Sequence, residues 1–209
     1  MNQDRFAQIR PYNDDEVRAV LDRLLRNAEF IAALTRLRFP RAGGALGALL
    51  RPIVRLYLGR QLAGVASVAG FQQVVEKYMT AMIEASTTEF TVSGLERLDP
   101  SRAGLYIGNH RDIALDPAFV NYALYANGRD TVRIAIGDNL LTKDYVSDLM
   151  RLNKSFIVRR SAKGPRQMLA ALQELSGYIR HSLLEERSSI WIAQREGRAK
   201  DGWDRTEPA

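Results

Sequence analysis

From Thr87 onwards the sequence alternates between short apolar runs and longer amphipathic stretches, and this alternation limits the possible folds more than any other feature. Short apolar runs bounded by turn residues are typical of buried strands. We expect strands at residues 88–98, 104–110, 131–138, 155–160 and 188–194. We expect helices at about 117–126, 140–150 and 165–186. Such β–α alternation predicts an α/β fold, in which a mostly parallel or mixed sheet is flanked by helices.

The residues before Thr87 have a different pattern, which is helical. Asn13 is expected to cap a helix with an acidic first turn, the sign of charge that the helix dipole favours there. One apolar stripe at helical spacing follows: Val17, Val20, Leu21, Leu24, Leu25, Ile31 and Leu34. After a break at residues 39–44, further helices are expected at about 46–62 and 65–83. The sequence thus predicts an N-terminal helical region, residues 1–86, and an α/β domain, residues 87–209.

The composition limits the chemistry and the partners. The chain has 209 residues, of which 46% are hydrophobic, so one substantial core can form without a disulfide or a metal. It contains no cysteine, which excludes thiol nucleophiles and thiolate metal sites. A formal net charge of +6 favours an anionic partner. No uncharged run approaches the roughly 18 apolar residues that a membrane-spanning helix needs.

Polar residues follow four of the expected strands. In open α/β sheets, ligands commonly bind beyond the carboxyl ends of the strands. The segments at these ends are 109–112, 137–139, 159–160 and 195–198. We therefore expect one site at this edge of the sheet.

The first of these segments contains His110, one of two histidines in the chain, within YIGNHRDIALDPA, residues 106–118. A neutral imidazole can take a proton from an alcohol, and a nearby carboxylate can fix its tautomer. Asp112 and Asp116 are both candidates for that carboxylate. The alternative is a histidine at a strand end, with Asp116 capping a helix that begins at Pro117. A kinase catalytic loop is excluded, because Pro117 replaces the expected asparagine and no glycine-rich phosphate loop is present.

Three segments together resemble the glycerol-phosphate and lysophosphatidate acyltransferases. The histidine segment is similar to the family's His-x4-Asp motif. FIVRR, residues 156–160, resembles its second block, and IAQREGR, residues 192–198, resembles its third. The resemblance covers about residues 87–200 and follows the family's order. Members usually continue through another strand and further helices, so we expect this chain to be truncated at its C-terminus.

The resemblance implies an O-acyltransferase of phospholipid synthesis. His110 would deprotonate a hydroxyl of glycerol 3-phosphate or a lysophosphatidate, or of a lyso-aminolipid or dihydroxyacetone phosphate. That hydroxyl would attack the thioester of acyl-coenzyme A or acyl-acyl carrier protein, with no metal and no other cofactor. The family's residues for the acceptor phosphate would correspond to Arg159, Arg160, Glu196, Gly197 and Arg198. A non-catalytic lipid- or phosphate-binding module on the same fold is the alternative.

The spacing within the histidine motif departs from the family, since five residues rather than four separate His110 from Asp116. Neither spacing brings the two side chains together inside a regular helix, so the intervening residues must turn. Asp116 precedes a proline and is therefore biased out of the α region, which allows such a turn. We favour Asp116 as the orienting carboxylate. Asp112 would then pair with Arg111, another cation or a backbone amide.

The third block departs as well, because Arg198 follows Glu196 by two positions rather than three. The cation that meets the phosphate there is Arg195, Arg198 or Lys200. Elsewhere, Asp138 and Asn139 are expected to do no more than cap a helix. His181 is expected to be a solvated helix residue.

The excess of arginine concentrates in residues 36–60, which contain no acidic residue. Apolar residues interleave with these arginines, a pattern typical of a helix that lies on anionic lipid. The alternative is a helix packed on the domain with its arginines in water. No nucleic-acid motif is present, so we expect no nucleic-acid partner. These features predict a peripheral protein on the cytoplasmic side of a membrane.

Overall fold

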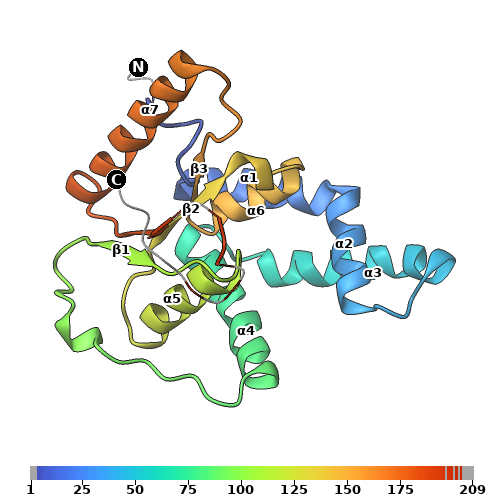
Figure 1. Ribbon diagram of the computed structural model, residues 1–209. Coiled ribbons are helices and arrows are strands. Elements are labelled where there is room, and N and C mark those ends of the chain that lie inside the picture. Colours follow the sequence, from blue (N-terminus) through green and yellow to red (C-terminus); the bar gives the residue numbers. More distant parts are fainter. Residues whose placement is uncertain (1–3, 196, 200, 202, 204–209) are drawn as a thin grey trace. The chain divides into compact units, whose positions relative to one another are not determined.

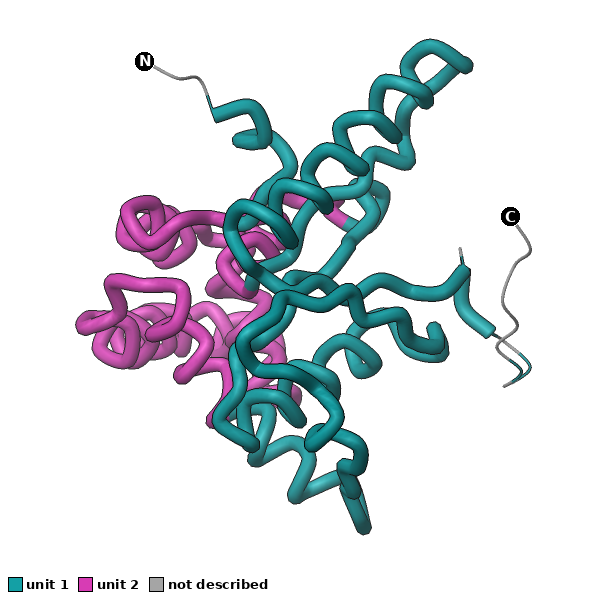
Figure 2. Tube along the Cα trace, turned by 90° about the vertical axis from the view of Figure 1, so that its left-hand side faces the viewer, with its two compact units in different colours: residues 1–11, 78–140, 154–209 teal, residues 12–77, 141–153 magenta. Residues whose placement is uncertain are grey.

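The chain forms two compact units (Figure 2). The computed structural model describes residues 4–195, 197–199, 201 and 203. Unit 1 comprises residues 1–11, 78–140 and 154–209, and unit 2 comprises residues 12–77 and 141–153. The expected division into two domains near residue 87 stays a prediction.

Unit 1 is built on a sheet of four strands (Figure 1). The strands are β1 (Leu105–Gly108), β2 (Arg133–Gly137), β3 (Ser155–Val158) and β4 (Ile190–Ala193). Their order in the sheet is β1-β4-β2-β3, and each described pair is parallel. The predicted α/β class is therefore confirmed. All four strands point their carboxyl ends to the same edge of the sheet.

The two faces of this sheet have separate cores, because successive residues of a strand point to opposite faces. One core contains Phe6, Ile9, Phe156, Tyr178 and Ile190. The other contains Leu124, Val132, Ile134 and Trp191. Helix α7 (Pro165–Leu184), between β3 and β4, packs in the first core. Helix α5 (Leu115–Ala126), between β1 and β2, packs in the second.

The strand expected at residues 88–98 is not formed, and this prediction is wrong. Gly94 adopts a positive φ and is followed by a short 3-10 helix, η1 (Leu95–Arg97). The guanidinium of Arg129 donates to the carbonyls of Leu95 and Leu98, so these carbonyls have partners without a strand ladder. Phe90 packs against the rings of Phe119 and Tyr122 on α5. These tertiary contacts outweigh the local strand preference.

Unit 2 is helical. It contains α1 (Asp14–Arg26), α2 (Ala28–Arg38), α3 (Gly44–Leu62), α6 (Asp144–Leu152) and the first part of α4 (Val68–Ser86), which ends in unit 1. Asn13 is the N-cap of α1 as expected, and its amide donates to the carboxylate of Glu16. Within the residues described, none of the helices is both long and apolar enough to cross a bilayer.

The expected continuous stripe from Val17 to Leu34 is divided between two helices. Asn27 ends α1, and its side-chain oxygen accepts from the amide of Phe30 at 2.9 Å, which caps α2. Asparagine is a favoured cap because its side chain replaces a missing helical acceptor. Residues of both helices still enter one core, beside Leu152 of α6.

Candidate active site at the carboxyl edge of the sheet

The segments that follow β1 and β4 are joined by hydrogen bonds at the carboxyl edge of the sheet. The amide of Gln194 donates to the carbonyl of Gly108 at 2.9 Å, and its side chain donates to Asn109 at 3.0 Å. The amide of Ala199 donates to the carbonyl of His110 at 2.8 Å. The first and third motif segments therefore lie side by side, although about 85 residues separate them.

The structure places His110 beside Asp116. Nδ1 of the imidazole lies 3.7 Å from Oδ2 of the carboxylate, and both side chains are largely buried, with 19% and 24% of their surface exposed. The same Oδ2 accepts from the amides of Arg111 and Asp112, at 2.6 and 2.9 Å. Residues 109–114 are not helical, so the turn between the two side chains is present as expected. These amide bonds fix Asp116 where its carboxylate faces the ring.

Asp112 has a different part in the same turn. Its Oδ1 accepts from the amides of Ala114 and Leu115, each at 2.8 Å. These backbone hydrogen bonds lower the pKa of Asp112, with a smaller contribution from the positive charge of Arg198. The carboxylate thereby satisfies amides at the start of α5. The helix begins at Leu115 and contains Asp116 in its first turn, so the alternative in which Asp116 caps a helix beginning at Pro117 is wrong.

The third segment contributes cations and one glycine. Gly197 has φ +79° with open space around its α-carbon, so the backbone conformation, rather than close approach, requires glycine here. The positive charge of Arg198 contributes to the lowered pKa of Asp112. Nε of Arg195 is buried and has no hydrogen-bond partner among the residues described. Glu196 and Lys200 lie outside the described residues.

The segments after β2 and β3 are joined by Asp138. Its carboxylate accepts from the amides of Arg160 and Ser161, at 3.0 and 3.1 Å, and from the Ser161 hydroxyl. Burial opposes its ionisation, but these hydrogen bonds hold the pKa of Asp138 below its usual value. The expectation that Asp138 merely caps a helix is wrong, because it fixes the backbone that carries the two arginines. Its position opposite β3 depends on strand pairing and could not be seen in the sequence.

The two arginines after β3 differ in their surroundings. Nε of Arg159 lies 3.4 Å from a carboxylate oxygen of Glu174 on α7, and its side chain is about half exposed. Arg160 is exposed, and its stem passes over Gly137, where a β-carbon would lie 3.0 Å from Cδ of Arg160. Glycine at 137 therefore leaves room for this side chain and for that of Asn139, whose Oδ1 would lie even closer to a β-carbon. Both cations lie at the carboxyl edge, where they can meet an anionic group.

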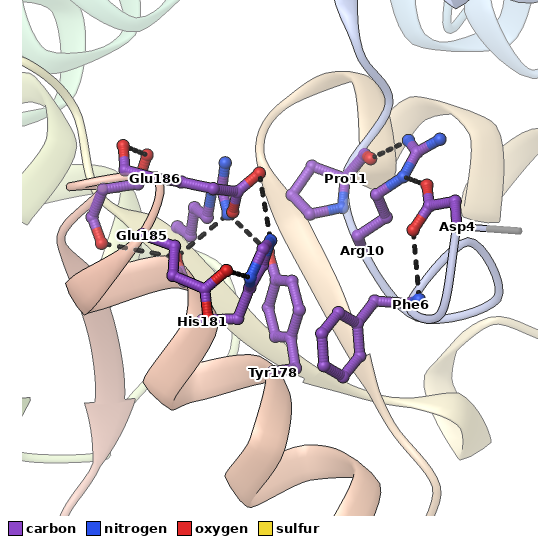
Figure 3. A network of polar contacts seen from close by, with 11 residues as sticks. Asp4, Phe6, Arg10, Pro11, Tyr178, His181, Glu185 and Glu186 are labelled. Carbon is purple, nitrogen blue, oxygen red and sulfur yellow. Dashed lines mark hydrogen bonds and ion pairs between the residues drawn. The ribbon is translucent and has the colours of Figure 1, made fainter. Parts of the chain in front are cut away.

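His181 lies on α7, far from this edge, and is not simply solvated. Its Nδ1 lies 2.8 Å from Glu185, and its ring packs on Phe6 with ring centroids 5.3 Å apart (Figure 3). Tyr178, one turn earlier, accepts a hydrogen bond from Arg133 at 2.9 Å. His181 is thus a half-buried member of a polar network at the amino edge of the sheet.

A family model named Acyltransferase matches residues 89–202, which is more than half of the chain. The chain belongs to this family, that of the glycerolipid acyltransferases. Family membership supports an O-acyltransferase that acts in glycerolipid synthesis. No curated protein matches the sequence.

Proposed function

We propose that this protein transfers an acyl chain from acyl-coenzyme A or acyl-acyl carrier protein to a hydroxyl of a glycerol phosphate acceptor. The observation that carries the proposal is the placement of His110 against Asp116, at the edge that also holds Arg159 and Arg160. The acceptors we propose are lysophosphatidate and glycerol 3-phosphate. The resulting ester would serve phospholipid synthesis.

His110 is proposed as the general base. Because Nδ1 faces Asp116, the carboxylate favours the tautomer that carries its proton on Nδ1. The lone pair then lies on Nε2, which accepts the proton of the acceptor hydroxyl. The hydroxyl oxygen attacks the thioester carbonyl, a C–O bond forms and the C–S bond breaks. The proton passes from Nε2 to the leaving thiolate, which restores the neutral histidine.

The distance of 3.7 Å is longer than a hydrogen bond, and catalytic hydrogen bonds often tighten only when substrate is bound. As the imidazole takes up a proton, its attraction to the carboxylate of Asp116 increases. Asp112 is proposed to act on the turn rather than on the ring, because its carboxylate accepts from the amides of residues 114 and 115.

Arg159, Arg160 and Arg198 are proposed to bind the acceptor phosphate. Glu196 is proposed to hold an acceptor hydroxyl or to order the arginines, and Gly197 supplies the positive φ beside it. Guanidinium groups bind phosphate oxygens in a bidentate geometry, which orients the acceptor. Apolar side chains close to His110 in the chain, Ile107, Ile113 and Leu115, are exposed and would contact the acyl chains. No metal or further cofactor is proposed.

We also propose that helix α3 of unit 2 contacts an anionic membrane on its cytoplasmic side. Exposed apolar residues recur along it at helical spacing: Leu46, Leu49, Ile53 and Leu56. Arg51, Arg55 and Arg60 are exposed on the same helix, and residues 30–75 contain no acidic residue. Apolar groups with adjacent arginines suit the headgroup region of anionic lipid.

The proposal is tested by acyl transfer in detergent micelles, with labelled thioester donors and with phosphorylated acceptors beside plain glycerol. Wild-type protein should acylate a phosphorylated acceptor, and Arg160→Gln should raise KM for it without a comparable fall in kcat. Folded protein that binds these acceptors but transfers nothing would favour the non-catalytic module, whose support is the long distance between His110 and Asp116.

A further inference from the structure

The first half of α7 extends beyond the core of its own unit (Figure 1). The residues of α7 that pack in the core begin at Leu175, and Tyr178, Ile179 and Leu183 follow at helical spacing. Residues 165–174 precede them and span about 15 Å at the rise of an α-helix. Residues 163–170 are all exposed. This part of the helix is therefore without a covering element among the described parts of unit 1.

The apolar face of α7 nevertheless continues into this extension. Met168 and Leu172 lie seven and three residues before Leu175, which puts them on the same face of the helix. Leu169 lies beside them. All three side chains are more than half exposed: Met168 53%, Leu169 57% and Leu172 58%. An apolar face that continues past its packing partner marks a contact surface.

Basic residues adjoin this apolar end. Lys163 and Arg166 are exposed, and Arg159 and Arg160 precede them in the chain. Residues 149–173 contain no aspartate or glutamate. The segment that leads into the extension is therefore positively charged and suits an anionic partner.

The extension stands at the same edge of the sheet as His110. The chain leaves β3 at its carboxyl end and enters α7 at Pro165 after the short loop 159–164. Because β1 and β3 belong to one parallel sheet, the carboxyl end of β1, which leads to His110, lies at that edge as well.

We infer that Met168, Leu169 and Leu172 insert into an anionic lipid surface, with Lys163 and Arg166 at its headgroups. Three side chains at a projecting helix end offer far less contact area than the roughly 800 Å² that each partner buries in a specific protein interface. Insertion into lipid needs only apolar groups beside cations. The inference deepens the proposed function, because it gives the catalytic unit its own contact with the lipid that holds the acceptor.

The test uses the full chain, which has no cysteine, labelled at a single introduced cysteine with a polarity-sensitive fluorophore. Leu169→Cys is compared with Leu184→Cys, an exposed leucine at the other end of α7. Vesicles contain phosphatidylcholine alone or equal parts of phosphatidylcholine and phosphatidylglycerol, without any substrate. With the mixed vesicles, emission at position 169 should shift to shorter wavelength, while emission at position 184 should not change.

The cations are tested in the same assay. Arg166→Gln should lower the partition of the Leu169→Cys protein onto mixed vesicles about fivefold, the contribution of one cation near such a surface. Arg180→Gln, an exposed arginine later in α7, is the matched control and should leave it unchanged.

Several results would overturn the inference. The protein could fail to bind the mixed vesicles, or it could bind while emission from position 169 does not shift. Emission from positions 169 and 184 could also shift equally. A shift caused by an acidic acyl carrier protein without lipid, or by raising the protein concentration alone, would assign the surface to a protein partner or a second copy. Since no turnover is measured, failure of the proposed acyl transfer leaves this test intact.

Discussion

The aspartates at the carboxyl edge and the charged side chains at the amino edge of the sheet in unit 1 have different main partners. At the carboxyl edge, the carboxylates of Asp112, Asp116 and Asp138 accept from backbone amides. At the amino edge, charged side chains meet one another (Figure 3). At the carboxyl edge these hydrogen bonds fix the turns that carry His110 and the two arginines after β3. The amino-edge contacts close a network over the core.

The amino-edge network is centred on Arg133, at the start of β2. Its guanidinium donates to Tyr178 and Ser182, both at 2.9 Å, and pairs with Glu186. Hydrogen bonds next to a buried core are electrostatically stronger than those in water, so this network should stabilise the fold. The comparison therefore predicts that changes at the carboxyl edge alter activity, whereas changes at the amino edge alter stability.

The largest difference is expected between the two aspartates beside His110. Asp116→Asn should lower kcat about 100-fold, because the amide cannot stabilise the imidazolium or select its tautomer. Asp112→Asn keeps an oxygen that can accept from the amides of residues 114 and 115, so its kcat should stay close to wild type. Steady-state acyl transfer measures both. Equal losses in the two variants would contradict the separate parts given to these carboxylates.

At the amino edge, Tyr178 should make stability depend on alkaline pH. Burial raises the pKa of Tyr178 to about 12, although Arg133 opposes the shift. Because the folded value lies above the ordinary value near 10, this stabilisation is complete below pH 10 and is lost as the pH rises towards 12. The shift corresponds to about 3 kcal/mol in the free energy of unfolding, of which about 2 kcal/mol is lost by pH 11.5.

Urea unfolding of wild type and Tyr178→Phe at pH 9 and 11.5 measures this effect. The wild type should lose more stability between the two values than the variant, which lacks the phenol. Acyl transfer at pH 7 should be alike in both proteins. The same loss in both would show that other groups cause the alkaline destabilisation.

The smallest effect is expected at Asp138. Asp138→Ala removes the acceptor that holds the amides of Arg160 and Ser161. The two arginines would be less well positioned, so KM for a phosphorylated acceptor should rise about tenfold. The rise is modest because the freed amides of these exposed residues can bond to water instead. The value of kcat should change little, since His110 is not touched. The Ser161→Ala variant, which keeps both amides, should show a smaller rise.

Much of the fold follows from local sequence. The four parallel strands begin and end within a few residues of the expected positions, since each is a short apolar run. The strand expected at 88–98 failed because Phe90 and Arg129 make tertiary contacts that no local pattern records. The break at Asn27 carried a local signal, because asparagine is a favoured cap.

The site was accessible to sequence reasoning only in part. The structure has the side chains of Asp116 and His110 together, as expected. The reason given for it was wrong, because Asp116 is helical despite Pro117 and the turn lies earlier, at residues 109–114. The links made by Asp138 and by Arg133 span 22 and about 50 residues, so they depend on strand order, which periodicity does not reveal. The network around His181 was missed for the same reason.

The two histidines, one at each edge, test the central claim most directly. His110→Ala and His181→Ala should be assayed for acyl transfer to lysophosphatidate beside wild type, with the thermal midpoint of each protein measured in parallel. We predict that His110→Ala loses at least about 100-fold in kcat with its midpoint unchanged, and that His181→Ala keeps its kcat with a lower midpoint. Full transfer by folded His110→Ala would contradict the assignment of His110 as the base.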